Sequence, residues 1–155
     1  MTETRTEAPR TPAPVMGMYD EVMWQSIRDG ALQLQHCTSC GTVLYPPAPV
    51  CPHCLSTKLE WRAVSGRGTV LSWVVFHKTY LEAYPAPYNV IAVRLDEGAV
   101  MVSNLEPPLP KGNWIGKKVK MIYHAMLDGL VLPRFVLEQG DDAGPARAQC
   151  NRIRV

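Results

Sequence analysis

The chain has 155 residues, a mass of 17.2 kDa and a formal net charge of +2. This length suits one domain or two small modules and excludes a large multidomain enzyme. Charged residues make up 19% of the sequence, against about 25% in an average domain, so charge alone indicates no nucleic-acid partner. No apolar stretch approaches the roughly 20 residues of a membrane span, and the polar start does not resemble a signal peptide. We therefore expect a cytoplasmic protein.

The first 30 residues divide into two parts. Residues 1–17 combine Thr, Glu, Ala and Pro without apolar periodicity, which predicts a disordered arm. Apolar side chains then recur at helical spacing, and Gly30 stands where a helix would end. This pattern predicts a helix over residues 18–30 with an apolar stripe formed by Tyr19, Val22, Met23 and Ile27. Trp24 lies at the edge of the stripe, either as a core residue or as a contact for another chain.

Residues 31–64 contain four cysteines in two C-x2-C pairs. Cys37 and Cys40 are separated by ten residues from Cys51 and Cys54. Each two-residue spacing forms a tight turn that directs two thiolates at one point, and two such turns complete a tetrahedron around one Zn²⁺. Four thiolates leave no open coordination position, so we expect a structural metal. Iron bound as in rubredoxin is the competing assignment, and the colour of the protein would separate the two.

Short runs flanking the cysteines alternate between apolar and polar residues, which predicts small antiparallel strands and completes a rubredoxin-like zinc ribbon. Two histidines beside the cysteines, His36 and His53, are expected to lie outside the ligand set because four thiolates already fill it. Cys150 stands apart from the others and is expected to be a free thiol on a flexible tail of residues 140–155.

Residues 65–139 contain five stretches rich in β-branched or aromatic residues, with no long helical pattern between them. The stretches are residues 68–76, 88–95, 100–105, 117–123 and 130–137. Turn sequences Asp96-Glu97-Gly98 and Asp128-Gly129 indicate antiparallel connections. Five short strands need a nearly closed sheet to hide their edges, which predicts an OB-fold barrel. The predicted fold class is therefore mainly β: an N-terminal helix, a four-cysteine zinc ribbon and a five-stranded barrel.

The sequence contains no nucleophile elbow, P-loop, dinucleotide-binding or zinc-protease motif. Carboxylates in the barrel occupy turns, so a general acid–base pair is difficult to assemble. We therefore expect a binding protein. The connection over residues 77–87 is long for a hairpin, and in OB barrels this loop lines a common ligand face. The candidate partner contacts are Trp24, Tyr80, Tyr84 and Trp114.

The order helix, Cys₄ ribbon, OB barrel resembles the DUF35 family, the zinc-ribbon OB-fold proteins associated with acyl-CoA metabolism. The resemblance covers about residues 19–138. It is carried by short motifs: Trp24 and Gly30-Ala31-Leu32, Cys37-Thr38-Ser39-Cys40-Gly41, Tyr45-Pro46-Pro47, Cys51-Pro52-His53-Cys54, Trp61, Ser65-Gly66-Arg67-Gly68-Thr69-Val70, Leu95-Asp96-Glu97-Gly98, Ile115-Gly116-Lys117-Lys118-Val119 and Phe135.

This resemblance implies a non-catalytic accessory subunit that stabilises or activates a thiolase-fold acyl-CoA enzyme. The implied partners are a thiolase or a lipid-transfer-protein-like aldolase, including those of steroid side-chain breakdown, and a hotdog-fold enoyl-CoA hydratase. It also implies that the barrel packs near the active-site entrance of the enzyme and contacts the CoA arm. The four cysteines match the family motif residue by residue. For a CoA thioester, Lys78, Arg94 and Lys117 are the candidate contacts.

A single-stranded nucleic-acid-binding module is the alternative, because ribbons and OB barrels both bind single strands through aromatic side chains in a basic groove. The near-neutral charge and the grouping of aromatic residues in loops argue against it. A rubredoxin-like electron carrier is a third interpretation, which a red, iron-containing preparation would support.

Overall fold

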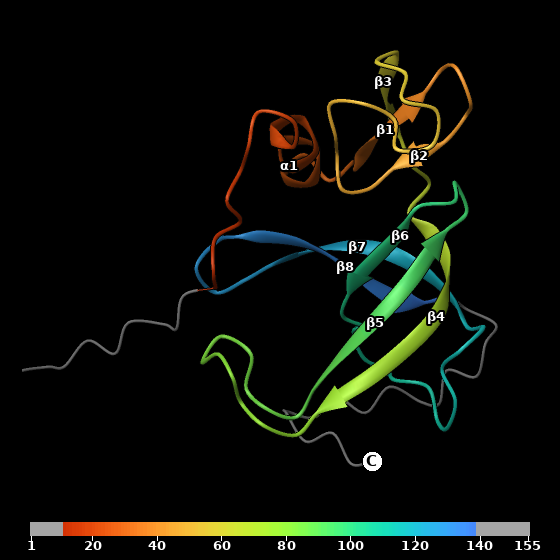
Figure 1. Cartoon of the computed structure of the whole chain (residues 1–155). Coiled ribbons are helices and arrows are strands. Elements are labelled where there is room, and N and C mark those ends of the chain that lie inside the picture. Colours follow the sequence, from red (N-terminus) through yellow and green to blue (C-terminus); the bar gives the residue numbers. More distant parts are fainter. Residues whose placement is uncertain (1–10, 139–155) are drawn as a thin grey trace, which may run out of the picture.

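The computed structural model describes residues 11–138 (Figure 1). The start of the predicted arm and the predicted tail with Cys150 lie outside the described residues. In chain order the elements are α1 (Glu21–Arg28), β1 (Gln33–Cys37), β2 (Val43–Leu44), β3 (Leu59–Ala63), β4 (Arg67–Phe76), β5 (Tyr88–Leu95), β6 (Val100–Ser103), β7 (Lys118–Ala125) and β8 (Val131–Leu137). The mainly β fold class predicted from the sequence is confirmed.

Helix α1 is shorter than predicted and presents a different face to the core. Its buried residues are Met23, Ser26 and Ile27. Tyr19 and Val22 are 45% and 44% exposed, so their assignment to the buried stripe is wrong. The reason is the place where the next strand attaches: the Ser26 hydroxyl donates to the carbonyl of Met23 at 2.6 Å and accepts the N–H of Gln33 at 2.9 Å. These bonds fasten β1 to the Ser26 side of the helix.

Three short strands form the ribbon sheet in the order β2-β1-β3, with both pairs antiparallel. The predicted alternation is confirmed in β3. Around β1, Leu32 and Leu34 are fully buried as expected, but Gln35 is also buried, and its side-chain oxygen accepts the N–H of Ala48 at 2.8 Å. Strand β2 has two residues, too few to leave an alternating pattern in the sequence.

The five predicted barrel strands form one antiparallel sheet in the order β6-β5-β4-β7-β8 (Figure 1). The sheet curls until its two edges meet. There, Leu105 forms a parallel bridge with Phe135, the N–H of Phe135 donates to the carbonyl of Asn104 at 3.0 Å, and the N–H of Glu106 donates to the carbonyl of Phe135 at 2.7 Å. This near-closure hides most of the exposed sheet edge, as expected for an OB barrel.

One hydrophobic core joins the helix, the ribbon and the barrel. It contains Ile27 of α1, Leu34 of the ribbon and Phe135 of the barrel within a single cluster of buried residues. A hydrogen bond of 2.6 Å from the N–H of Leu32 to the hydroxyl of Tyr123 adds a polar link across the same junction. The ribbon is therefore packed against the barrel rather than tethered to it.

Trp114 belongs to this core, which corrects its prediction as a partner contact. Its side chain is 5% exposed and its ring stacks on that of Trp73 in β4, with centroids 4.6 Å apart. The connection between β6 and β7 folds back against the barrel, so the indole is buried inside the molecule and leaves no surface for another chain.

The segment before α1 lies against the far end of the barrel, beside the turn between β7 and β8 (Figure 1). The N–H of Thr11 donates to a carboxylate oxygen of Asp128 at 2.6 Å. Hydrogen bonds from the backbone N–H groups of Thr11 and Leu130 hold the pKa of Asp128 below its ordinary value. The last part of the predicted arm thus has a defined contact. Among residues 11–138, no helix is long and apolar enough to cross a membrane.

Candidate functional site

The two cysteine pairs lie on turns of the same design. The N–H of Gly41 donates to the carbonyl of Cys37 at 2.8 Å, and the N–H of Leu55 donates to the carbonyl of Cys51 at 2.8 Å. Both closing residues have left-handed backbones, with φ of 77° at Gly41 and 60° at Leu55. Glycine adopts this conformation without a steric penalty, whereas leucine is held there by the turn around it.

These turns bring the four cysteine sulfurs together. All four Sγ atoms lie within 4.8 Å of one another. The Sγ atoms of Cys37 and Cys54 are 3.5 Å apart, and those of Cys40 and Cys51 are 3.6 Å apart. Zinc–sulfur bonds of about 2.3 Å in a tetrahedron place the sulfurs about 3.8 Å apart. The four thiols are free of disulfides and therefore fit one structural zinc ion, which cross-links the two turns.

The electrostatics of the cluster also favour a cation. Hydrogen bonds from the hydroxyl and N–H of Thr42 lower the pKa of the Cys40 thiol to about 5. The N–H of Ser56 favours the Cys54 thiolate, but the hydrogen bond to Cys40 and burial outweigh it and raise the pKa of Cys54 to about 12. Four thiolates at this separation cannot all be charged without a counterion. A divalent metal removes that conflict.

A second feature is the outer face of β4, β5 and β6, which we call the barrel face. The strand register places on it Ser72, Val74, Phe76, Tyr88, Val90, Ala92, Arg94, Val100 and Val102. Most of these residues are apolar, although they point away from the core. Val74, Val100 and Val102 are 45%, 42% and 64% exposed. On an antiparallel sheet the face that points away from the core is normally polar. An apolar outer face therefore indicates a surface that contacts another molecule.

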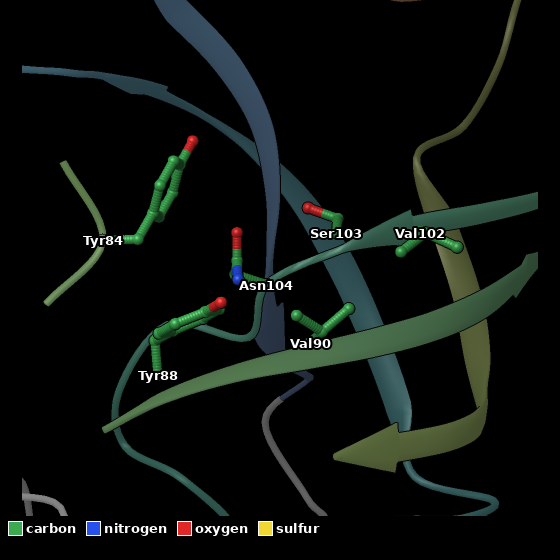
Figure 2. Close-up of a pocket in the computed structure, with 6 residues that line it drawn as sticks. All are labelled: Tyr84, Tyr88, Val90, Val102, Ser103 and Asn104. Carbon is green, nitrogen blue, oxygen red and sulfur yellow. The ribbon is translucent and has the colours of Figure 1, made fainter. Parts of the chain in front are cut away.

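The barrel face contains a hollow of about 230 Å³, lined by Tyr84, Tyr88, Val90, Val102, Ser103 and Asn104. Figure 2 shows Tyr84 and Tyr88 on one side and the two valines on the other, with the Asn104 amide between them. The Asn104 Oδ1 atom points into the space between Tyr84 and Ser103 (Figure 2). The hollow is thus mainly apolar, with the Asn104 amide at its floor and the Ser103 hydroxyl, which donates to the carbonyl of Pro133 at 2.6 Å, beside it.

Buried polar contacts hold the walls of this hollow. The Arg134 side chain is 13% exposed, and its guanidinium lies 6.0 Å from the centre of the Tyr84 ring. The same guanidinium donates to the Glu106 carboxylate at 2.5 Å. Asn89 is buried beneath the floor and exchanges two hydrogen bonds with the backbone of Leu105, at 2.9 and 2.7 Å. The Asn104 amide nitrogen donates to the carbonyl of Asn89. The hollow is therefore supported from β5, β6 and β8 together.

Replacing Asn89 with Ala should loosen this support. The change leaves the N–H and the carbonyl of Leu105 buried without partners, which costs about 2–5 kcal/mol of the free energy of unfolding. Urea denaturation monitored by tryptophan fluorescence measures the loss. As a control, Asn113→Ala removes an exposed hydrogen bond to Ile115 and should cost no more than about 1 kcal/mol. Equal effects for the two variants would contradict the structural role of Asn89.

The other predicted partner contacts occupy different places. Tyr84 lines the hollow, and Tyr80 lies on the same loop, 63% exposed, with its ring edge-on to Phe76. Trp24 lies on α1, is half-buried and packs against the core cluster, so it is not part of the barrel face. The structure therefore brings together two of the four predicted contacts.

The three candidate CoA contacts are not brought to one place. Arg94 on β5 is paired with Thr69 of β4, next to the start of β7. Lys117 precedes β7 and is near this end of the sheet. Lys78 follows the other end of β4, with Nζ 5.7 Å from the centre of the Tyr80 ring. Strand β4 continues from Thr69 to Phe76, which corresponds to about 23 Å, and Lys78 lies beyond that end.

The aliphatic residues of the barrel face, together with Glu106, were missed by the sequence analysis. A usable signal was present in β5 and β6, whose sequences YNVIAVRL and VMVS are apolar at nearly every position. Continuous apolar runs indicate strands covered on both faces. In an antiparallel barrel the inner face of each strand is covered by the core, so whatever covers the outer face must come from outside the sheet.

Two family models match the chain. Residues 24–60 match the rubredoxin-like zinc ribbon domain of ChsH2, and residues 61–124 match the C-terminal OB-fold domain of ChsH2. A curated DUF35 domain-containing scaffold protein of Methanothermobacter thermautotrophicus is 34% identical over 108 residues, covering 68% of this chain and 74% of the relative. The chain belongs to the DUF35 family.

A solved DUF35 chain has the same fold. It comes from the structure described as Ltp2-ChsH2(DUF35) aldolase, with a TM-score of 0.73 and 31% identity, covering 81% of this chain and 98% of that one. The family assignment agrees with the four clustered cysteines, and the DUF35 ribbon carries one structural zinc.

Two longer relatives of this DUF35 chain are named as hydratase subunits. A probable enoyl-CoA hydratase alpha subunit of Thermomonospora curvata is 33% identical over 134 residues, or 86% of this chain. The 3-oxo-4,17-pregnadiene-20-carboxyl-CoA hydratase alpha subunit of Mycobacterium tuberculosis is 30% identical over 100 residues, or 64% of this chain. The matches span only 42% and 32% of those relatives.

Proposed function

We propose that this DUF35 chain is a non-catalytic accessory subunit that binds and stabilises a thiolase-fold acyl-CoA enzyme of the lipid-transfer-protein-like aldolase kind. The observation that carries the proposal is the barrel face: exposed valines and aromatic rings on the outside of a sheet that is already packed on its inside. Such a surface is costly to leave in water and suits a protein partner.

The comparisons support this role in two ways. The relative of known structure is named as part of an aldolase assembly, and the archaeal relative is named as a scaffold protein. In the two hydratase subunits, more than half of each chain lies outside the match. We therefore assign catalysis to the partner, and a hydratase subunit is a second candidate partner on the strength of those names.

The nucleic-acid alternative is less well supported by the geometry. Binding of single strands needs a basic groove with aromatic side chains on which bases stack. The centre of the barrel face is aliphatic, and the candidate cations Arg94 and Lys78 lie at its two ends. We propose an acyl-CoA thioester, including those of steroid side-chain breakdown, as the substrate of the complex, and the cytoplasm as its location.

The proposal is tested by purifying the tagged protein from its host after nuclease treatment, identifying bound proteins by mass spectrometry and measuring zinc in the same sample. We expect a stoichiometric thiolase-fold enzyme with one zinc per DUF35 chain. Adding the chain to that enzyme should raise its melting temperature or its activity with acyl-CoA substrates. Nucleic-acid-binding proteins that are recovered alone from a parallel sample without nuclease, and lost after nuclease treatment, would instead favour the alternative function.

A further inference from the structure

The barrel face has the parts of a protein-docking site arranged around one pocket. Energetically important contacts in protein interfaces cluster where an aromatic side chain fills a pocket surrounded by apolar residues. Here the hollow between Tyr84 and Val102 is that pocket, with a volume of about 230 Å³. The exposed Val74 and Val100 extend the apolar surface on either side of it.

The chemistry of the hollow restricts what can fill it. Its walls are two tyrosine rings and two valines, which favour a large apolar or aromatic group. At its floor, the Oδ1 atom of Asn104 points into the open space (Figure 2). Within residues 11–138 no donor reaches this oxygen, since the recorded bond of the Asn104 side chain is made by its nitrogen. An occupant with an apolar body and one N–H or O–H group meets both requirements.

The pocket is also formed before a partner arrives. Tyr84 is placed by the Arg134 guanidinium, which Glu106 holds at 2.5 Å. The floor is fixed by the bonds between Asn89 and Leu105. A wall that is already in place loses little conformational entropy on binding.

Charge defines the partner further. The outward residues of β4, β5 and β6 include no acidic side chain, and the barrel face itself carries one charge, on Arg94. In the part of the chain that the structure describes, Arg94 forms no ion pair. A second cation lies beside it, since Lys118 donates through Nζ to the hydroxyl of Thr69, the residue opposite Arg94, at 2.8 Å. A carboxylate on the partner complements the positive charge at this edge of the apolar surface.

We propose that the thiolase-fold aldolase docks on the barrel face by inserting a tryptophan or tyrosine side chain into the hollow and placing a carboxylate opposite Arg94. This inference rests on the proposed function and specifies which surface performs it. The inserted ring lies between Tyr84 and Val102, and its N–H or O–H donates to Asn104 Oδ1.

Another exposed apolar cluster lies at the start of α1, where Met18, Tyr19 and Val22 are at least 44% exposed. The hollow beside it, about 390 Å³, is lined mostly by polar side chains, including Glu21, Gln25 and Asp29. Charged and amide groups there would lose water without gaining partners in an apolar contact. This cluster serves as the matched control surface.

The test compares Val102→Arg on the barrel face with Val22→Arg on α1. Both change an exposed valine to arginine, and circular dichroism and zinc content check that each variant is folded. Binding to the purified aldolase is measured by isothermal titration calorimetry. Val102→Arg should raise the dissociation constant about 100-fold or more, the loss of affinity typical of a central interface residue. Val22→Arg should leave it within about threefold.

Unchanged binding by Val102→Arg, or a larger loss for Val22→Arg, would overturn the inference while the accessory function stands. If the wild-type chain binds no thiolase-fold enzyme, the proposed function itself fails. Replacing Tyr84 with the photo-crosslinker p-azidophenylalanine tests the inserted side chain. A cross-linked aldolase peptide that contains Trp or Tyr supports the proposal, and a peptide without either contradicts it.

Discussion

Replacing Cys51 with Ser is expected to release the zinc ion and unfold the ribbon. Cys51 is fully buried and its Sγ lies 3.6 Å from that of Cys40, so the remaining three thiolates cannot close the tetrahedron. In small zinc domains the metal contributes apparent binding free energies of about 10–16 kcal/mol, and this energy holds the fold. Elemental analysis should show zinc falling from one equivalent to near zero. Hydrogen exchange should show loss of protection in β1 and β3.

Cys150→Ser provides the control, because this cysteine is distant in sequence from both C-x2-C pairs. That variant should retain one equivalent of zinc and the wild-type melting temperature. A Cys51→Ser protein that keeps one tightly bound zinc and an unchanged melting curve would show that the four-cysteine assignment is wrong. A red wild-type protein containing iron would instead show that the metal has been misidentified.

Replacing Phe135 with Ala is expected to cost about 3–5 kcal/mol of the free energy of unfolding, the range for removing a buried aromatic ring. Phe135 is fully buried in the core that joins the helix, ribbon and barrel. Its backbone also makes the bonds that close the sheet against Asn104 and Glu106. The lost ring leaves a cavity directly beneath the barrel seam, so urea denaturation should show a lower midpoint.

Two variants at the same place separate cavity formation from other effects. Phe135→Leu keeps most of the volume and should cost less than about half as much. Val136→Ala, on the half-exposed neighbour, should cost about 1 kcal/mol or less. If Phe135→Ala were no more destabilising than Val136→Ala, the single shared core would be incorrect.

The sequence predicted the features whose signals are local. The C-x2-C spacing identifies the metal centre because each turn positions its own two thiolates. The barrel strands are visible because each contains its own run of β-branched residues. The exposure of Tyr19 and Val22 could not be predicted in this way, because the side of α1 that is covered depends on where β1 attaches through Ser26.

The β4 part of the barrel face was hidden from the sequence for a different reason. Strict alternation from Val70, which is buried, would send Val74 to the inside of the sheet. Strand β4 has a register shift between Val70 and Ser72, which reverses the alternation and turns Val74 and Phe76 outward. A one-residue irregularity therefore places side chains with a core pattern on the barrel face, the proposed docking surface.

The core shared between ribbon and barrel has a consequence for regulation. Leu32 and Leu34 emerge from the metal-bound sheet and pack in the same cluster as the buried residues of β4, β5 and β6. The stability supplied by the metal therefore extends to the strands that carry the proposed docking surface, and it rises with the logarithm of free zinc. Assembly of the proposed complex is thereby thermodynamically linked to zinc supply, and a host short of zinc would lose the docking surface together with the ribbon.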